Sequence, residues 1–418
     1  MELEPRNKHK IMALLEKGVK ILNPMTLYVD DDVQVDQISG NGVAIYPGCR
    51  IYGSKTVISQ GAQIGFEGPV TMEDCQVGPH VELKGGYFRK SVFLEKSSMG
   101  LGAHVREGSI LEELSGGAHC VGLKQTILFP FATLGSLINF CDCLLAGGTS
   151  RKDHSEVGSS YIHFNFSAAG DKITPSLFGD VPRGVMLNEP PIFLGGQGGA
   201  VGPIRLGFGN VVSAGTILRK DVMRERRLIM GKAHRGGELP LALNRYAGLS
   251  RMLEKNLFYL AGLVALEQWY RHVRRDFFHG EELGYLVYKG ALDNLILARE
   301  ERIKRLKAVA EKMPESVHHD NGDSKKNRNL EFFRNLDHVC CVFDDDRELL
   351  SANKHRDPFL EALAIQKRDR GPDYISVIQS LPGTISREGT KWLEAIVDDR
   401  CEKAAGFLPS MDLFGKSN

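Results

Sequence analysis

Hydrophobic residues recur every six positions between about residues 25 and 223. The first part of the repeat runs through Ile45, Ile51 and Val57, then Ile58, Ile64 and Val70, then Val77 and Leu83, then Phe93, Met99, Val105 and Leu111. The repeat returns at Leu194, Ala200, Leu206, Val212 and Leu218. A six-residue period is typical of a parallel β-helix, in which each short strand turns one aliphatic side chain inward and three hexads close a coil. Glycines concentrate before residue 236, where they suit tight corners that need positive φ.

A different pattern follows from about residue 240, where apolar residues take helical spacing. The helical spacing begins near residue 240 and recurs over 281–313, 331–350, 356–369 and 388–406. A short helix is also expected over 5–18, closed by Gly18. The fold class we predict is mainly β: a left-handed parallel β-helix over 25–236 followed by an α-helical domain over 237–418. Residues 1–24 form an N-terminal helix and linker, and the polar segment near 314–328 is expected to be a flexible linker.

The segment Gly147–Lys172 interrupts the six-residue repeat with polar residues. It carries two histidines, His154 among charged neighbours in "SRKDHSE" and His163 in "YIHFNF". Histidine is a frequent general base because its pKa lies near working pH. The bland alternatives are a surface-loop histidine for His154 and a backbone-satisfied strand or corner residue for His163.

Composition narrows the functional classes. The net charge of the 418 residues is +1, which argues against a general nucleic-acid binder. The cysteines show no secreted-framework spacing, and the Cys141-Asp-Cys143 pair is better explained by reduced thiols than by a metal. The N-terminus lacks the apolar core of a signal peptide, and no run of about 18 apolar residues predicts a membrane span. We therefore expect a cytoplasmic protein without a metal.

Several motifs give the β-helix a family resemblance. They are "ALLEKGVKILNP", "YVDDDVQV", "GAHVREG", "LKQTIL", "HFNFSAAGDK" and "GPIRLGFGNVVSAGTILRKDV". Over residues 12–236 the chain resembles the acetyltransferase half of the bifunctional glucosamine-1-phosphate acetyltransferase / N-acetylglucosamine-1-phosphate uridyltransferase family. No Gly-rich nucleotide loop of the uridyltransferase type precedes the β-helix in this sequence, and the helical region has no counterpart. The resemblance implies trimers whose active sites lie between neighbouring β-helices.

The resemblance also suggests a site for the acceptor substrate. Arg106 matches the family arginine that holds a substrate phosphate, and Lys124 follows 18 residues later, as the family's phosphate-binding lysine does. Arginine offers a planar fork of donors and lysine a point charge, which suits a phosphate or diphosphate. Asn139, Asp142 and Lys172 fall on or near further family positions around the acceptor. An outward-facing surface pair is the competing interpretation of Arg106 and Lys124.

The catalytic histidine of the family is missing at its usual place. In "GSLINFCDC", Ser136 stands where the family has that histidine, and Asn139 stands where it has a tyrosine. An amine acceptor still needs a base. We therefore expect the base to have moved to His154 or His163.

The resemblance places the acyl donor, acetyl-CoA, along the later coils. The residues implied in its binding are Ser159, near the position of the oxyanion-donating backbone N–H, Asn165, Phe166, Gly196, Ala214, and either Lys232 or Arg235. Gly196 replaces a family serine, so one hydroxyl contact is lost.

Two classes of function remain open from the sequence. The first is an acyl-CoA-dependent transferase, acting as a homotrimer on an amino sugar phosphate or nucleotide sugar. The second is a non-catalytic sugar-nucleotide-binding or scaffold protein, or a partner of a separate uridyltransferase; loss of the family histidine and tyrosine favours this class. A carbonic-anhydrase-like zinc site would need three coil-surface histidines, and His104, His119, His154 and His163 show no matching spacing.

Overall fold

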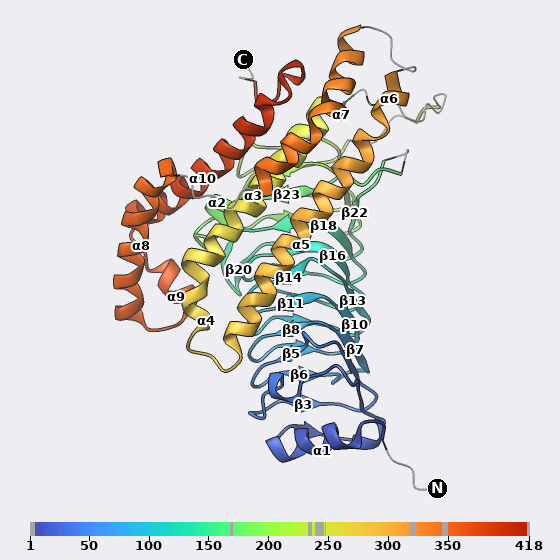
Figure 1. Cartoon of the computed structure of the whole chain (residues 1–418), viewed down its shortest axis with the longest axis vertical. Helices are drawn as coiled ribbons and strands as arrows, with labels where there is room; N and C mark the ends of the chain where they lie inside the picture. The colour runs from blue at the N-terminus through green and yellow to red at the C-terminus, as the bar shows by residue number, and fades with distance from the viewer. Residues whose placement is uncertain are drawn as a thin grey trace.

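A computed structural model describes residues 5–167, 170–232, 236–238, 246, 248–317, 323–344 and 350–415. It consists of a long stack of β-coils and a helical region that lies along one side of the stack (Figure 1). The predicted parallel β-helix followed by a helical C-terminal region is confirmed.

The β-helix has three faces, each a ladder of parallel strands. The first face contains β1 (Lys20–Ile21), β3 (Ala44–Ile45), β6 (Gln63–Ile64), β9 (Glu82–Leu83), β12 (Ser98–Met99), β15 (Gly116–Gly117), β17 (Thr133–Leu134), β21 (Glu156–Val157), β24 (Phe193–Leu194), β27 (Val211–Val212) and β29 (Leu228–Ile229). The second contains β2 (Tyr28–Val29), β4 (Arg50–Tyr52), β7 (Val70–Glu73), β10 (Gly86–Arg89), β13 (Ala103–Val105), the first halves of β16 (Gly122–Leu128) and β18 (Asn139–Leu145), β22 (Ile162–Phe164), β25 (Gly199–Val201) and β28 (Ile217–Leu218). The third contains β5 (Val57–Ile58), β8 (Gln76–Val77), β11 (Ser91–Phe93), β14 (Ser109–Leu111), the second halves of β16 and β18, β23 (Ser176–Phe178) and β26 (Arg205–Leu206).

Strand register explains the six-residue repeat. Ser98 pairs with Gly116, and Phe193 pairs with Val211, a step of three hexads in each case. Every aliphatic position of the predicted repeat is buried inside the coils. Stacking like side chains at about 4.8 Å intervals removes them from water, which is the main stabilising contribution available to so regular a chain.

The polar segment Gly147–Lys172 leaves the coil twice rather than once. A small antiparallel hairpin, β19 (Gly148–Ser150) with β20 (Asp153–His154), projects first. β21 and β22 then return to the coil in parallel register. A second departure, the loop 165–175, separates β22 from β23.

The helices agree with the predicted periodic segments, although their ends differ by several residues. They are α1 (Lys8–Lys17), α2 (Val181–Gly184), α3 (Leu249–Trp269), a π-helical turn η3 (Tyr270–Arg274), α4 (Arg275–Phe278), α5 (Gly284–Ala310), α6 (Met313–Ser316), α7 (Asp323–Asp344), α8 (Leu350–Arg370), α9 (Tyr374–Gln379) and α10 (Gly383–Gly406). Within the segment near 314–328 that was expected to be a linker, residues 314–316 belong to α6 and residues 323–328 belong to α7, and residues 318–322 lie outside the described residues. In the described part of the chain, no helix is long and apolar enough to cross a membrane.

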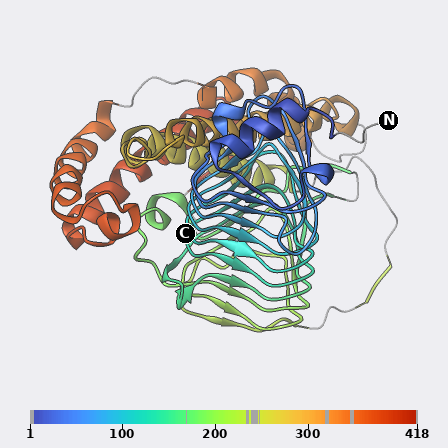
Figure 2. The same cartoon turned by 90° about the horizontal axis from the view of Figure 1, so that it is seen from below.

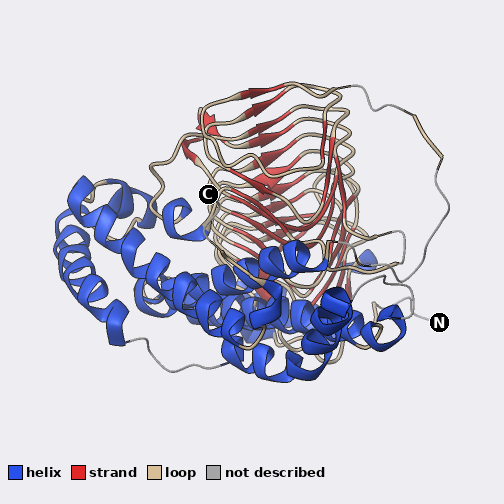
Figure 3. Cartoon of the chain, turned by 90° about the horizontal axis from the view of Figure 1, so that it is seen from above, coloured by secondary structure: helices blue, strands red, loops and turns tan. Residues whose placement is uncertain are grey.

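The helical region covers the third face of the β-helix. α5 packs across β8, β11 and β14, and α3 packs against β23 and α2. The views along the coil stack show the C-terminal helices gathered on one side of it, while α1 lies across its N-terminal end (Figures 2 and 3). Trp269 anchors the helices to one another, with its ring 5.6 Å from Phe359 and 6.4 Å from Trp392. Trp269 therefore belongs to the core.

Candidate functional site

Three long edges separate the faces of the β-helix, and the predicted site residues are divided among them. We call the edge between the second and third faces, which carries Arg106 and Lys124, the cation edge. The edge between the first and second faces carries Ser136 and Ser159 and is called the serine edge. The edge between the third and first faces carries the β19–β20 hairpin and is called the hairpin edge.

Arg106 and Lys124 are neighbours on the cation edge. Val105 pairs with Leu123, so the residues that follow them occupy matching positions on adjacent coils. Phe88 pairs with Val105, which extends the column to Arg89. Lys124 forms an ion pair with Glu107 at 2.8 Å, whereas the exposed Arg106 side chain has no ion pair within the described residues. The coil geometry thus produces a short ladder of cations on an outer edge.

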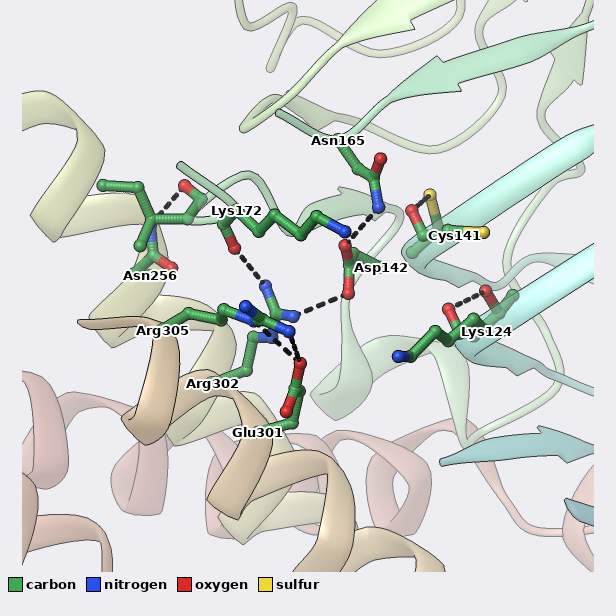
Figure 4. Close-up of polar contacts among 12 residues, drawn as sticks. Lys124, Cys141, Asp142, Asn165, Lys172, Asn256, Glu301, Arg302 and Arg305 are labelled. Carbon is green, nitrogen blue, oxygen red and sulfur yellow. Dashed lines mark hydrogen bonds and ion pairs between the residues drawn. The ribbon is translucent and has the colours of Figure 1, made fainter. Parts of the chain in front are cut away.

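Asp142 is buried and both of its oxygens are occupied. Arg302 of α5 donates Nη2–H to Oδ1 at 2.7 Å, and Asn165 donates Nδ2–H to Oδ2 at 2.8 Å (Figure 4). This carboxylate fastens α5 to the β-helix. The roles expected for Asp142 and Asn165 at the substrate and the cofactor therefore stay predictions, beside this structural contact. Asn139, three residues earlier on β18 and exposed, accepts a hydrogen bond from the Cys141 thiol at 3.1 Å.

The helical region also holds residues 171–173, which lie between β22 and β23. Arg302 donates Nη1–H to the carbonyl of Lys172 at 3.0 Å, and Asn256 of α3 donates to the carbonyl of Ile173 at 2.9 Å. Lys312 forms an ion pair with Asp171 at 2.7 Å. The Lys172 side chain itself is exposed and extends toward Asp142 (Figure 4). This segment is thus a docking point for the helices, a purpose that the sequence pattern did not reveal.

His163 lies inside the β-helix. Asn139 pairs with Ile162 and Ile162 pairs with Gly199, which puts His163 in the inward column with Phe140 and Ala200. Its Nδ1 lies 2.7 Å from the carbonyl oxygen of Cys141, and its Nε2 lies 2.7 Å from Ser176 Oγ. Since a carbonyl only accepts, Nδ1 carries the proton and Nε2 accepts from the serine hydroxyl. Burial lowers the pKa of His163 to about 4, so the ring is neutral near pH 7. These are the features of a core histidine, and the base expected here has no route to a substrate.

His154 lies on β20, at the hairpin edge. Its Nε2 is 4.0 Å from Glu156, and its Nδ1 is buried without a hydrogen-bond partner in the described chain. The third face, covered by α3 and α5, separates this edge from the cation edge. A single chain therefore does not bring His154 together with Arg106 and Lys124.

The serine edge gathers three of the predicted cofactor residues into one column. Leu134 pairs with Val157, Val157 with Leu194, and Leu194 with Val212. The residues two places further on therefore stack in the order Ser136, Ser159, Gly196 and Ala214. A Cβ on Gly196 would lie 2.8 Å from the Ser159 carbonyl oxygen, so glycine keeps this part of the edge close-packed.

Three other predicted cofactor residues lie away from this column. Asn165 and Phe166 follow β22 on the cation edge, and Phe166 is 60% exposed. Lys232 is exposed just after β29. Arg235 lies outside the described residues.

Sequence reasoning missed the contribution of the neighbouring coil to the serine edge. Gly117 pairs with Leu134, so His119 occupies the position next to Ser136 in the same column. His119 Nδ1 lies 2.9 Å from Ser136 Oγ. The spacing of 17 residues between them, close to one coil, was the available signal.

Comparison with known proteins identifies relatives of the β-helix. The Bifunctional protein GlmU of Thermotoga maritima is 30% identical over 220 residues, which cover 52% of this chain and 44% of that protein. The Bifunctional protein GlmU of Trichlorobacter lovleyi is 24% identical over 212 residues, covering 50% of this chain and 41% of the relative. Half of this chain is homologous to GlmU. No protein-family model matches the chain.

The extent of these matches limits what they carry over. The chain spans less than half the length of the curated relatives it matches. The homology is consistent with the acetyltransferase half and with a hexapeptide acyltransferase fold. Within the described residues, no cluster of three or more histidine, cysteine or acidic side chains is arranged to hold a metal ion.

Proposed function

We propose that this protein is an acyl-CoA-dependent transferase of the hexapeptide-repeat type, with acetyl-CoA as the acyl donor and an amino sugar phosphate or nucleotide sugar as the acceptor. The observation that carries the proposal is the pairing of Arg106 and Lys124 on adjacent coils. Two cations at matching strand positions, one of them without an ion pair in the described chain, suit a phosphate or diphosphate. Similarity of the β-helix to GlmU supports the same class of reaction.

The donor in this proposal lies along the serine edge. Ser159, Gly196 and Ala214 form a column of small residues, which leaves room for an extended thioester chain. Lys232, exposed beyond the last strand, is available to a cofactor phosphate. A homotrimer, as the resemblance implies, would bring edges of neighbouring copies together and give the site its walls.

The test is release of free CoA from acetyl-CoA, measured with glucosamine 1-phosphate and with a UDP-linked amino sugar. Arg106→Ala should raise KM for the acceptor by about 10- to 100-fold, the equivalent of a charged hydrogen bond. Arg50→Ala is the matched control, because Arg50 is an exposed arginine on the same face, several coils away. No CoA release with any amino sugar in a panel would overturn the proposal.

A second function is favoured by one observation, the occupation of Asp142 by Arg302 and Asn165. A non-catalytic sugar-nucleotide-binding protein would keep the cation ladder and lose the rest of the acceptor site. Thermal stabilisation by UDP-sugars, reduced in Lys124→Ala and unaccompanied by CoA release, would establish this alternative. His154→Ala tests the predicted base within the first proposal, since an unchanged rate would exclude His154 from that role.

A further inference from the structure

The serine edge carries a hydrogen-bonded serine and histidine that no predicted role explains. His119 and Ser136 occupy the same position on successive coils, and Ser136 Oγ lies 2.9 Å from His119 Nδ1. His119 is exposed and Ser136 is half-buried. A nucleophile within hydrogen-bond reach of a base is the arrangement that activates serine in covalent catalysis.

The backbone around the pair is fixed by the coil. The Leu137 N–H donates to the His119 carbonyl at 3.1 Å, and the Ser136 N–H donates to Ser159 Oγ at 3.1 Å. Cys120 and Leu137, which follow the two residues, share a left-handed φ of 57° and 60°. Matching corners on adjacent coils hold the two side chains in register, so little ordering remains for the moment of reaction.

A donor for a developing oxyanion lies beside the pair. The Ser159 N–H has no acceptor among the described residues. A Cβ on Gly135 would lie 2.8 Å from the Ser159 nitrogen, so the absent side chain of Gly135 leaves this N–H close to the backbone that carries Ser136. Preorganised backbone N–H groups next to the reacting carbon are the usual means of stabilising a tetrahedral oxyanion.

We propose that Ser136 is an acyl-accepting nucleophile with His119 as its base, so that transfer proceeds in two steps through an ester on Ser136. This inference rests on the proposed function for its donor and acceptor. In the first step Ser136 Oγ bonds to the thioester carbon as His119 takes the hydroxyl proton. The C–S bond breaks, and the leaving thiolate receives that proton from His119.

In the second step the acceptor amine attacks the ester carbon. His119 takes the proton from the amine nitrogen, the bond from Ser136 Oγ to carbon breaks, and the serine oxygen recovers the proton. The sum is a thioester and an amine converted to a thiol and an amide, with no other reactant.

The experiment treats the full-length protein with a fluorophosphonate, which reacts with activated serines independently of any acyl donor or acceptor. Peptide mapping should find the label on Ser136, with none at that position in Ser136→Ala. His119→Ala should slow labelling at least about 100-fold, the size of a lost general base. His104→Ala is the control, since His104 is also exposed but its ring lies 5.0 Å from that of Tyr87. Equal labelling of wild type and His119→Ala would overturn the inference.

Acetyl-CoA provides the second measurement. Wild-type protein mixed with acetyl-CoA alone should gain one acetyl group on Ser136, and Ser136→Ala should not. Cys120→Ser controls for acylation of the exposed neighbouring thiol. CoA release that is unchanged in Ser136→Ala would overturn the inference and leave the proposed function standing. Fluorophosphonate labelling of Ser136 without CoA release would overturn the proposed function and the acetyl ester with it, and would leave only an activated serine.

Discussion

The β-helix and the helical region are stabilised in different ways. Inside the β-helix, aliphatic side chains at equivalent positions repeat from coil to coil and are buried almost completely. Where the helices meet the third face, unique polar contacts join them: Arg302 to Asp142, Arg274 to Glu113, and Tyr270 to Glu112. The first arrangement repeats the same kind of contact from coil to coil, whereas the second depends on individual residue pairs.

The polar contacts mark the place where the helical region meets the β-helix. Asp142 stands at the cation edge, and Glu112 and Glu113 stand near the hairpin edge, so the polar contacts lie on both sides of the third face. The helices are thus fixed to the third face, which separates His154 at the hairpin edge from Arg106 and Lys124 at the cation edge. The second face, between the cation and serine edges, carries none of these three contacts.

The largest effect should come from breaking the Arg302–Asp142 pair. Its side chains are 2% and 5% exposed, and Arg302→Ala would leave a buried carboxylate without its cation. We expect the free energy of unfolding to fall by about 3–5 kcal/mol, measured by urea denaturation. Arg305→Ala is the control, because Arg305 pairs with Glu301 within one helix and should cost less than about 1 kcal/mol. Equal losses in the two variants would mean that the interface does not depend on this pair.

A smaller, pH-dependent effect is expected at Glu112. Burial raises the pKa of this carboxyl from an ordinary 4.5 to about 7, against the opposing charge of Arg274. The folded protein therefore binds the proton more tightly than the unfolded chain does. Its contribution is fully present below the unfolded pKa and is lost as the pH rises through the folded value.

Glu112→Gln, which keeps a hydrogen-bond acceptor for Tyr270, should remove that loss. Stability relative to wild type should rise by up to about 1.4 kcal/mol per pH unit between the two pKa values. Urea denaturation at several pH values from 4.5 to 8 measures it. Glu281→Gln is run in parallel, since burial also raises the pKa of Glu281 to about 7. A difference between Glu112→Gln and wild type that does not change with pH would contradict the assignment.

The smallest effect should come from the exposed pair between Lys55 of the β-helix and Asp293 of α5, 3.0 Å apart. The side chains are 65% and 42% exposed, so solvent and salt screen the attraction. Lys55→Ala should change the free energy of unfolding by no more than about 1 kcal/mol, and less at high salt. If Lys55→Ala lowered the free energy of unfolding as much as Arg302→Ala, buried and exposed ion pairs would contribute equally to this interface.

Much of the fold was predictable because its signals are local. The hexad at Leu194 to Leu218 and the helical spacing after residue 240 both report which side chains a strand or helix turns inward. The interval between β21 and β24 was harder, because it holds the loop 165–175 and α2 within one coil. Because this coil is irregular, the sequence repeat does not show that His163 points inward. Only the strand register, in which His163 pairs with Ala200, shows it.

The sequence by itself determined the β-helix, the helical region and the cation ladder, since each follows from residues at fixed spacing along one chain segment. Only the tertiary structure decided the fates of the polar residues. In the folded protein His163 is buried, Asp142 pairs with Arg302 from a helix 160 residues away, and His119 lies beside Ser136. The physical reason is that the environment of a polar side chain depends on its hydrogen-bond or ion-pair partner. These partners come from other coils or from a separate helix, so the local sequence pattern does not predict them.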